Sequence, residues 1–396
     1  MPARQRVGRD DLTALLASKE MVLVCGSGGV GKTTTAAAMA VAAAVEIGGR
    51  VLVLTVDPAR RLADALGVGA LGNTATRVPD SAFAAVGMEP RGELWAAMLD
   101  TKAGWDELIR RHAPDARTRD AVLANPLYQN ITARFVHSHD YLAMERLHEL
   151  HASGEYDLIV VDTPPSRNAL DVLDAPGRMK EFFGSKLLRW LTVPYRSRLF
   201  TMASKPFYQV ADKVLGSRFL QDVAEFFMLF QAMEKGFVAH AGEVEQLLAD
   251  PRTTFVVVST LEAAPTHEAG YLARELDRRQ LDLGAIVANR VLPEAFTTKA
   301  SATSARKLER AAAGPLADEV CAAIGPVAGD EVDRDVVAGV LTEVATRFHD
   351  IAVVATREAD RRAELGALSS LLVSVPLADG DIDDLAGLYQ LAKAFA

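Results

Sequence analysis

The densest group of residues suited to chemistry lies near the N-terminus, where glycines stand beside a lysine and hydroxyl side chains. The run consists of Gly26, Ser27, Gly28, Gly29, Val30, Gly31, Lys32, Thr33 and Thr34. Through Thr33 it matches the pattern G-x-x-x-x-G-K-[S/T]. Glycines let backbone N–H groups converge on phosphate oxygens, the lysine neutralises the β- and γ-phosphates, and the threonine hydroxyl is suited to Mg²⁺. The run therefore predicts a binding site for nucleotide phosphates.

The segments on either side of this run support the same interpretation. The apolar stretch Met21–Cys25 precedes it, and the Ala-rich stretch Thr33–Ile47 follows it with helical character. A strand, a glycine-rich loop and a helix in this order are the structural context that the motif requires. The N-terminus of the helix adds a partial positive charge. A tight turn that merely needs glycine is the alternative, and this context disfavours it.

Two aspartates follow other apolar stretches. Asp57 comes after Val51–Val56, and Asp162 comes after Leu158–Val161. Open α/β sheets bind ligands at the carboxyl ends of their strands. We expect Thr33, Asp57 and Asp162 to form a Mg²⁺ site, partly through water, and Asp57 and Lys32 to be the catalytic residues, with Asp57 orienting the attacking water. A helix N-cap is the alternative for Asp57.

Two further positions are candidates for the nucleotide base. Asn289 follows the apolar stretch Ala285–Ala288, and its amide can pair with the N6/N7 edge of adenine. A protein that reads guanine would carry an acid two residues later, where this chain has Val291. The sequence therefore favours ATP. Pro376, at the end of the last apolar stretch, is the candidate for a wall of the base pocket.

The apolar stretches also predict the fold. They are Met21–Cys25, Val51–Val56, Leu158–Val161, Phe255–Ser259, Ala285–Ala288 and Leu371–Val375. Each is apolar throughout, as in parallel strands buried on both faces, and helical stretches separate them. We expect an α/β fold with a doubly wound, mostly parallel sheet and helices on both faces. Residues 1–396 are expected to form a single P-loop domain, with helical insertions at about 90–153 and 171–250 that form a helical subdomain.

The second insertion is rich in aromatic residues and methionine. Nine of the 15 phenylalanines lie between Phe182 and Phe237. They predict either a groove for an apolar client or a core packed against the sheet, and base rates favour the core. Between Arg178 and Lys205 there are seven basic residues and a single acid, Glu181. This pattern suits a membrane interface or an acidic partner, and equally a solvated basic face.

Composition excludes several classes of protein. The 396 residues include 43 Lys and Arg against 52 Asp and Glu, for a net charge of −9, which disfavours a nucleic-acid binder. The two cysteines, Cys25 and Cys321, form neither a disulfide framework nor a CxxC pair, so we expect no zinc and a reducing, cytoplasmic location. The sequence shows neither a signal-peptide core nor an apolar run of about 18 residues, so we expect no transmembrane segment.

With these motifs the chain resembles the ArsA/Get-type P-loop ATPases, a family of the deviant Walker A class. The resemblance rests on GSGGVGKT, on DPARRLADAL from Asp57, on DTPPSRNAL from Asp162, on Asn289 and on the late segment VPLADGDIDDL, and so covers nearly the whole chain. It implies a Mg²⁺-dependent ATPase whose dimer closes on ATP binding and reopens on hydrolysis. It also implies a membrane-protein client or a membrane partner. The chain itself is then expected in the cytoplasm, in part at the inner face of the membrane.

One departure from that family opens an alternative. The family's signature lysine, second in the phosphate loop, is Ser27 here. A serine cannot supply positive charge to a transition state. The chain is therefore either a self-sufficient homodimeric ATPase or an ATP-binding regulatory subunit with little hydrolysis of its own. In the second case its partner is a lysine-bearing paralogue in a paired bacterial set. A ParA-like positioning protein that binds DNA ranks third.

Overall fold

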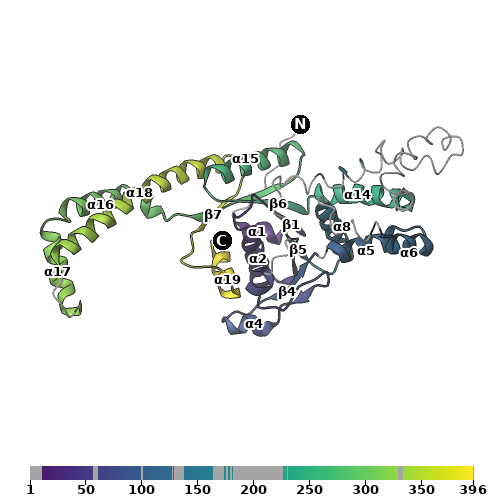
Figure 1. The fold of residues 1–396 in the computed structure, drawn as a ribbon, viewed down its shortest axis with the longest axis horizontal. Helices are drawn as coiled ribbons and strands as arrows, with labels where there is room; N and C mark the ends of the chain where they lie inside the picture. The colour runs from purple at the N-terminus through teal and green to yellow at the C-terminus, as the bar shows by residue number, and fades with distance from the viewer. Residues whose placement is uncertain are drawn as a thin grey trace, which may run out of the picture.

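A computed structural model of the protein shows an eight-stranded sheet at its centre (Figure 1). The structure describes residues 11–56, 61–99, 101–126, 128, 138–163, 174, 177–178, 181, 226–229, 231–328 and 333–395. The strands are β1 Met21–Cys25, β2 Gly49–Thr55, β3 Thr76–Arg77, β4 Gly92–Met98, β5 Leu158–Asp162, β6 Thr253–Ser259, β7 Leu283–Val291 and β8 Leu372–Pro376. Their order is β3-β4-β2-β5-β1-β6-β7-β8. Every neighbouring pair is parallel except β3 with β4.

The apolar stretches of the sequence are the strands of this sheet, which confirms the predicted α/β fold. In β1, Val22 and Val24 point to one face of the sheet, and Met21, Leu23 and Cys25 point to the other. All five side chains are buried, because both faces are covered. A strand in this position gains nothing from polar residues at alternate positions. This is why its sequence is apolar throughout.

Helices cover the two faces of the sheet. The first apolar core lies under α1 Leu12–Ala17, α2 Lys32–Ala42, α3 Arg61–Ala65, α4 Asp80–Ala85 and α19 Leu385–Ala392. The second lies under α8 Ser138–Ser153, α14 Glu234–Leu248 and α15 Ala263–Arg278. The helix α2 continues into a π-helical turn, Ala43–Ile47. The sheet is therefore doubly wound, and β1, which leads into α2, lies between β5 and β6.

A helical layer extends from one side of the sheet, where α5 Thr101–His112 and α6 Ala116–Ala124 pack with α8 and α14 (Figure 1). Phe226, Met233 and Phe237, from the Phe-rich interval, are buried in its core, so these three side chains line no open groove. Most of 171–225, including most of the basic stretch from Arg178 to Lys205, lies outside the described residues. The interval 90–153 is not wholly helical as predicted, because residues 92–98 form β4 and pair with β2.

An arm of three helices projects from the opposite side of the body (Figure 1). It consists of α16 Lys299–Ala311, α17 Pro315–Ala328 and the 33-residue α18 Arg334–Gly366. Only the C-terminal end of α18 reaches the sheet, where Leu365 enters the second core. None of the helices in the described part of the chain combines the length and apolar character that a membrane crossing requires.

Candidate functional site

The glycine-rich loop connects β1 to α2, and two of its glycines lie so close to neighbouring strands that a side chain would clash there. A Cβ at Gly26 would lie 2.2 Å from the carbonyl oxygen of Val258 on β6. Gly31, the N-cap of α2, has φ of 94°, and a Cβ there would lie 2.3 Å from Nδ2 of Asn289. The loop is thus pressed against the neighbouring strands, and its backbone conformation is set by steric exclusion.

The middle of the loop faces the other way. A Cβ at Gly28 or Gly29 would meet no atom within 4 Å, so the backbone is accessible on that side. Lys32 is 6% exposed, and its ammonium donates a hydrogen bond of 2.9 Å to the carbonyl oxygen of Ser27. The loop therefore presents open backbone next to a lysine cation and the N-terminus of α2, which is the arrangement that binds phosphate.

Asp162 lies beside the first turn of α2. It ends β5, is 1% exposed, and accepts hydrogen bonds from the Thr33 hydroxyl at 2.7 Å and the Thr55 hydroxyl at 2.9 Å, both through Oδ2. The parallel pairing of β2 with β5 places Thr55 directly opposite Asp162. Thr33 and Asp162 thus lie side by side, and Thr55 joins them as a residue that the sequence prediction lacked. A single sequence carries no signal for Thr55, because the contact requires β2 and β5 to be neighbours in the sheet.

The residue after Asp162 fixes the end of β5. The Thr163 backbone N–H and hydroxyl both donate to the carbonyl oxygen of Val24, at 3.3 and 2.8 Å. Next to it, burial raises the pKa of the Cys25 thiol to about 12. Although Cys25 directly precedes the loop, it is a protonated, buried thiol at neutral pH and lacks the reactivity of a thiolate.

Asn289 also belongs to the loop's surroundings. It ends the buried part of β7, is 6% exposed, donates from Nδ2 to the Val30 carbonyl oxygen at 2.8 Å, and accepts at Oδ1 from the Arg290 backbone N–H at 2.9 Å. Both ends of its amide thus contact the backbone. Its contact with adenine stays a prediction.

Three predicted site residues remain: Thr34, Pro376 and Asp57. Thr34 lies half-buried in the first turn of α2. Pro376 is exposed at the end of β8, where it pairs in register with Val291. Asp57 lies outside the described residues, as do the segments 57–60 and 164–173, so its roles in orienting water and binding Mg²⁺ stay predictions.

Comparisons with known proteins point to one family. The model of the family described as anion-transporting ATPase matches residues 19–314, which include β1, the loop, Asp162 and Asn289. The chain belongs to the anion-transporting ATPase family. It is 26% identical over 294 residues to the ATPase get3 of Schizosaccharomyces pombe, covering 74% of this chain and 80% of that protein. It is 27% identical over 276 residues to the ATPase GET3 of Malassezia globosa, covering 69% and 73%.

A bacterial relative is similar over a comparable length of this chain. An uncharacterized protein of Streptomyces coelicolor is 31% identical over 275 residues, which cover 69% of this chain and 63% of that protein. As a member of the anion-transporting ATPase family, the chain is an ATP hydrolase of the P-loop class. The family match ends at residue 314, so α17 and α18 of the arm, and β8 and α19, lie beyond it.

Proposed function

We propose that the chain is a Mg²⁺-dependent ATPase that works as a nucleotide-gated dimeric switch and acts on a membrane-protein client or a membrane partner. The observation that carries the proposal is the 2.7 Å hydrogen bond between the hydroxyl of Thr33 and the carboxylate of Asp162, beside the open face of the glycine loop. In P-loop enzymes a loop hydroxyl and a strand-end aspartate are the pair that holds Mg²⁺. Here they already lie within bonding distance of each other.

The residues fit ATP and Mg²⁺ by their chemistry. Thr33 and Asp162 offer oxygen ligands, which Mg²⁺ prefers, and Asp162 would reach the ion through water. Bound Mg²⁺ supplies charge neutralisation at the β- and γ-phosphates. Lys32 would add its charge to the same phosphates, and Asn289 would turn its amide from the Val30 carbonyl to the edge of adenine. Asp57 is the proposed residue that orients the attacking water, and Pro376 the proposed wall of the base pocket.

The client or partner is proposed to bind through 171–250. Support comes from the sequence, where phenylalanines, methionines and basic residues gather in this interval. Phe226, Met233 and Phe237 are excluded from the binding surface because they are buried. The helical layer that contains them, with the sheet, is proposed to be one P-loop domain with a helical subdomain.

The switch is tested by measuring the molar mass of the chain in solution with Mg²⁺ and a non-hydrolysable ATP analogue, and again with ADP. The proposal predicts a dimer whose compactness, followed by small-angle scattering, changes between the two nucleotides. Lys32→Ala should abolish the difference because it removes the phosphate contact. Lys307→Ala, an exposed lysine on α16, should leave it intact. Identical scattering with both nucleotides in the unchanged chain would contradict the switch.

A second function is favoured by a specific observation at Ser27. Its hydroxyl is buried and has no hydrogen-bond partner among the described residues, so the side chain is turned into the protein. A serine in this position offers no charge to a nucleotide on a second subunit. The observation supports an ATP-binding regulatory subunit that completes a heterodimer with a lysine-bearing paralogue.

The two functions differ in how they respond to a lysine at this position. If the chain works as a regulatory subunit, Ser27→Lys should raise the ATP turnover of the isolated chain by about 100-fold or more, the scale on which one preorganised charge acts in a transition state. If the chain is a self-sufficient ATPase, the same substitution should change turnover little. Ser27→Ala is the matched control and should leave turnover unchanged in either case.

A further inference from the structure

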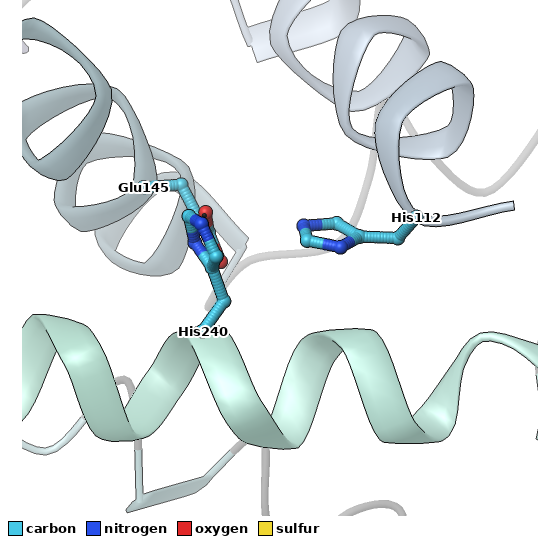
Figure 2. A group of neighbouring side chains, drawn as sticks. All are labelled: His112, Glu145 and His240. Carbon is cyan, nitrogen blue, oxygen red and sulfur yellow. Dashed lines mark hydrogen bonds and ion pairs between the residues drawn. The ribbon is translucent and has the colours of Figure 1, made fainter. Parts of the chain in front are cut away.

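A second cluster of chemically capable side chains lies in the helical layer, away from the nucleotide loop. His112 at the end of α5, Glu145 on α8 and His240 on α14 point toward one another (Figure 2). One potential ligand atom from each of the three lies within 4.8 Å of those of the other two. The Nδ1 atom of His240 is 2.5 Å from Oε2 of Glu145. Three helices that are distant in sequence thus deliver two imidazoles and one carboxylate to the same point.

Burial makes this combination unusual for ordinary packing. Glu145 is 3% exposed, and a buried carboxylate needs cations or hydrogen-bond donors around it. The Nε2 atom of His112 is buried and has no hydrogen-bond partner within the described part of the chain. A buried ring nitrogen without such a partner, beside a buried carboxylate and a second imidazole, is placed to bind a ligand.

The outer contacts of His240 fit the role of a metal ligand. Its Nδ1 atom faces Glu145, while Nε2 on the other edge of the ring lies 3.4 Å from a carboxylate oxygen of Glu243. A metal-binding histidine commonly donates its second N–H to a carboxylate, which fixes the tautomer and the ring orientation. Glu243 is placed to accept that hydrogen bond. His148 also faces Glu243, with Nε2 at 3.8 Å.

The ring of His112 is fixed by the surface of α14. A Cβ at Gly236 would lie 2.9 Å from Nδ1 of His112, so a glycine at this position lets the imidazole approach the helix. The next residue, Phe237, packs against the same ring, with 4.9 Å between the ring centroids. Gly236 and His240 lie one turn apart on the same face of α14. The contact at Gly236 therefore directs the imidazole of His112 along this face toward His240.

We propose that His112, Glu145 and His240 form a binding site for a divalent transition-metal cation of the zinc type. Two imidazoles and a carboxylate suit Zn²⁺, whereas Ca²⁺ and Mg²⁺ prefer sites built from oxygen alone. Zinc bonds of about 2.0–2.2 Å in a tetrahedron place ligand atoms about 3.3 Å apart. Small side-chain rotations from the present spread would reach that geometry and leave one tetrahedral position for water.

The position of the cluster gives such an ion a structural consequence. It would join α5, α8 and α14, and α8 leads directly into β5, which carries Asp162. The ion would therefore tie the helical layer to the strand that ends at the nucleotide site. This proposal is independent of the proposed ATPase switch, since none of the three ligands belongs to the loop. It also differs from the expectation of no zinc, which considered cysteine pairs alone.

The test is calorimetric titration of the full chain with Zn²⁺ after chelator treatment, with Co²⁺ as a spectroscopic probe of the ligands. We expect one ion per chain, and a Co²⁺ spectrum with nitrogen and oxygen ligands and no thiolate band. His112→Gln, Glu145→Gln and His240→Gln should each weaken Zn²⁺ binding by more than about 100-fold. Glu243→Gln, which removes only the outer contact, should weaken it by about 10-fold.

The matched control is His267→Gln, because His267 is exposed on α15 and lies outside the cluster. It should bind Zn²⁺ as the unchanged chain does. Thermal unfolding in chelator checks that each variant is folded. Zn²⁺ should raise the unfolding temperature of the unchanged chain and of His267→Gln, and should leave that of the His112, Glu145 and His240 variants nearly unchanged. Three results would overturn the proposal: absence of binding, equal binding by folded His112→Gln, or a thiolate band in the Co²⁺ spectrum. Loss of binding in His148→Gln with normal binding in His112→Gln would place the ion on the other edge of His240 and overturn it too.

Discussion

The hydroxyl of Thr55 offers the sharpest test of how the nucleotide site is built. Thr55 is 1% exposed and donates at 2.9 Å to Oδ2 of Asp162, the same oxygen that accepts from Thr33. Thr55→Val keeps the shape and strand preference of the side chain but removes this donor. A hydrogen bond to a charged group contributes roughly 1.5–3 kcal/mol to stability, so the expected loss is about 2 kcal/mol.

Two measurements follow from that magnitude. An unfolding entropy of about 2.1 cal/mol/K per residue over this chain converts about 2 kcal/mol into a fall of about 2 °C in Tm, measured by calorimetry. Asp162 also loses part of the support that orients its carboxylate, and supporting partners of this kind alter metal affinity by about 10–100-fold. The Mg²⁺ concentration for half-maximal ATP turnover should therefore rise by about 10-fold or more.

The control for Thr55→Val is Thr253→Val. Thr253 is also a strand threonine, is 0% exposed, and its hydroxyl has no hydrogen-bond partner among the described residues. Replacing a buried hydroxyl without a partner by a methyl group should leave Tm unchanged or raise it slightly. If Thr55→Val and Thr253→Val behave alike in both Tm and Mg²⁺ dependence, the reasoning about Asp162 is wrong.

Two further predictions concern the loop and the thiols. Gly31→Ala should lower stability by about 1–3 kcal/mol and weaken ATP binding, because its Cβ would collide with Asn289 at a backbone φ of 94°. Gly28→Ala is the control, since its Cβ would face open space, and it should leave the free energy of unfolding unchanged. Equal behaviour of the two variants in denaturant titrations would refute the steric argument. The folded protein should react with a thiol reagent near pH 8 at Cys321 alone, because burial raises the pKa of Cys25 to about 12. The labelled cysteine is identified by peptide mass. Rapid labelling of Cys25 would contradict its assignment as a buried thiol.

The parts of the fold that the sequence predicted are those with a strong local signal. β1 and the central residues of β5 and β6 are continuous apolar runs because both faces of each strand are buried. The loop after β1 has its glycines where the backbone lies against Val258 and Asn289. β4 was missed because its sequence, GELWAAM, contains good helix formers and no β-branched residue. Pairing in register with β2, a tertiary effect, determines its conformation.

Side-chain contacts between distant segments were harder to predict. Thr55 contacts Asp162 because β2 and β5 are neighbours in the sheet, which a single sequence does not reveal. The cluster of His112, Glu145 and His240 depends on three helices meeting in the helical layer, and none of the three stands at a spacing typical of metal ligands. The expectation of no zinc rested on the lack of a CxxC pair, and cysteine spacing carries no information about a cluster built from histidine and glutamate.

The central claim is that Lys32, Thr33 and Asp162 form a working Mg²⁺-dependent ATPase site. The most direct test is steady-state ATP hydrolysis by the purified full chain with and without Mg²⁺, beside Lys32→Ala. Turnover should require Mg²⁺ and fall to background in Lys32→Ala, while Lys307→Ala retains it. Turnover that is indifferent to Mg²⁺, or that persists in folded Lys32→Ala, would show that these residues do not form such a site.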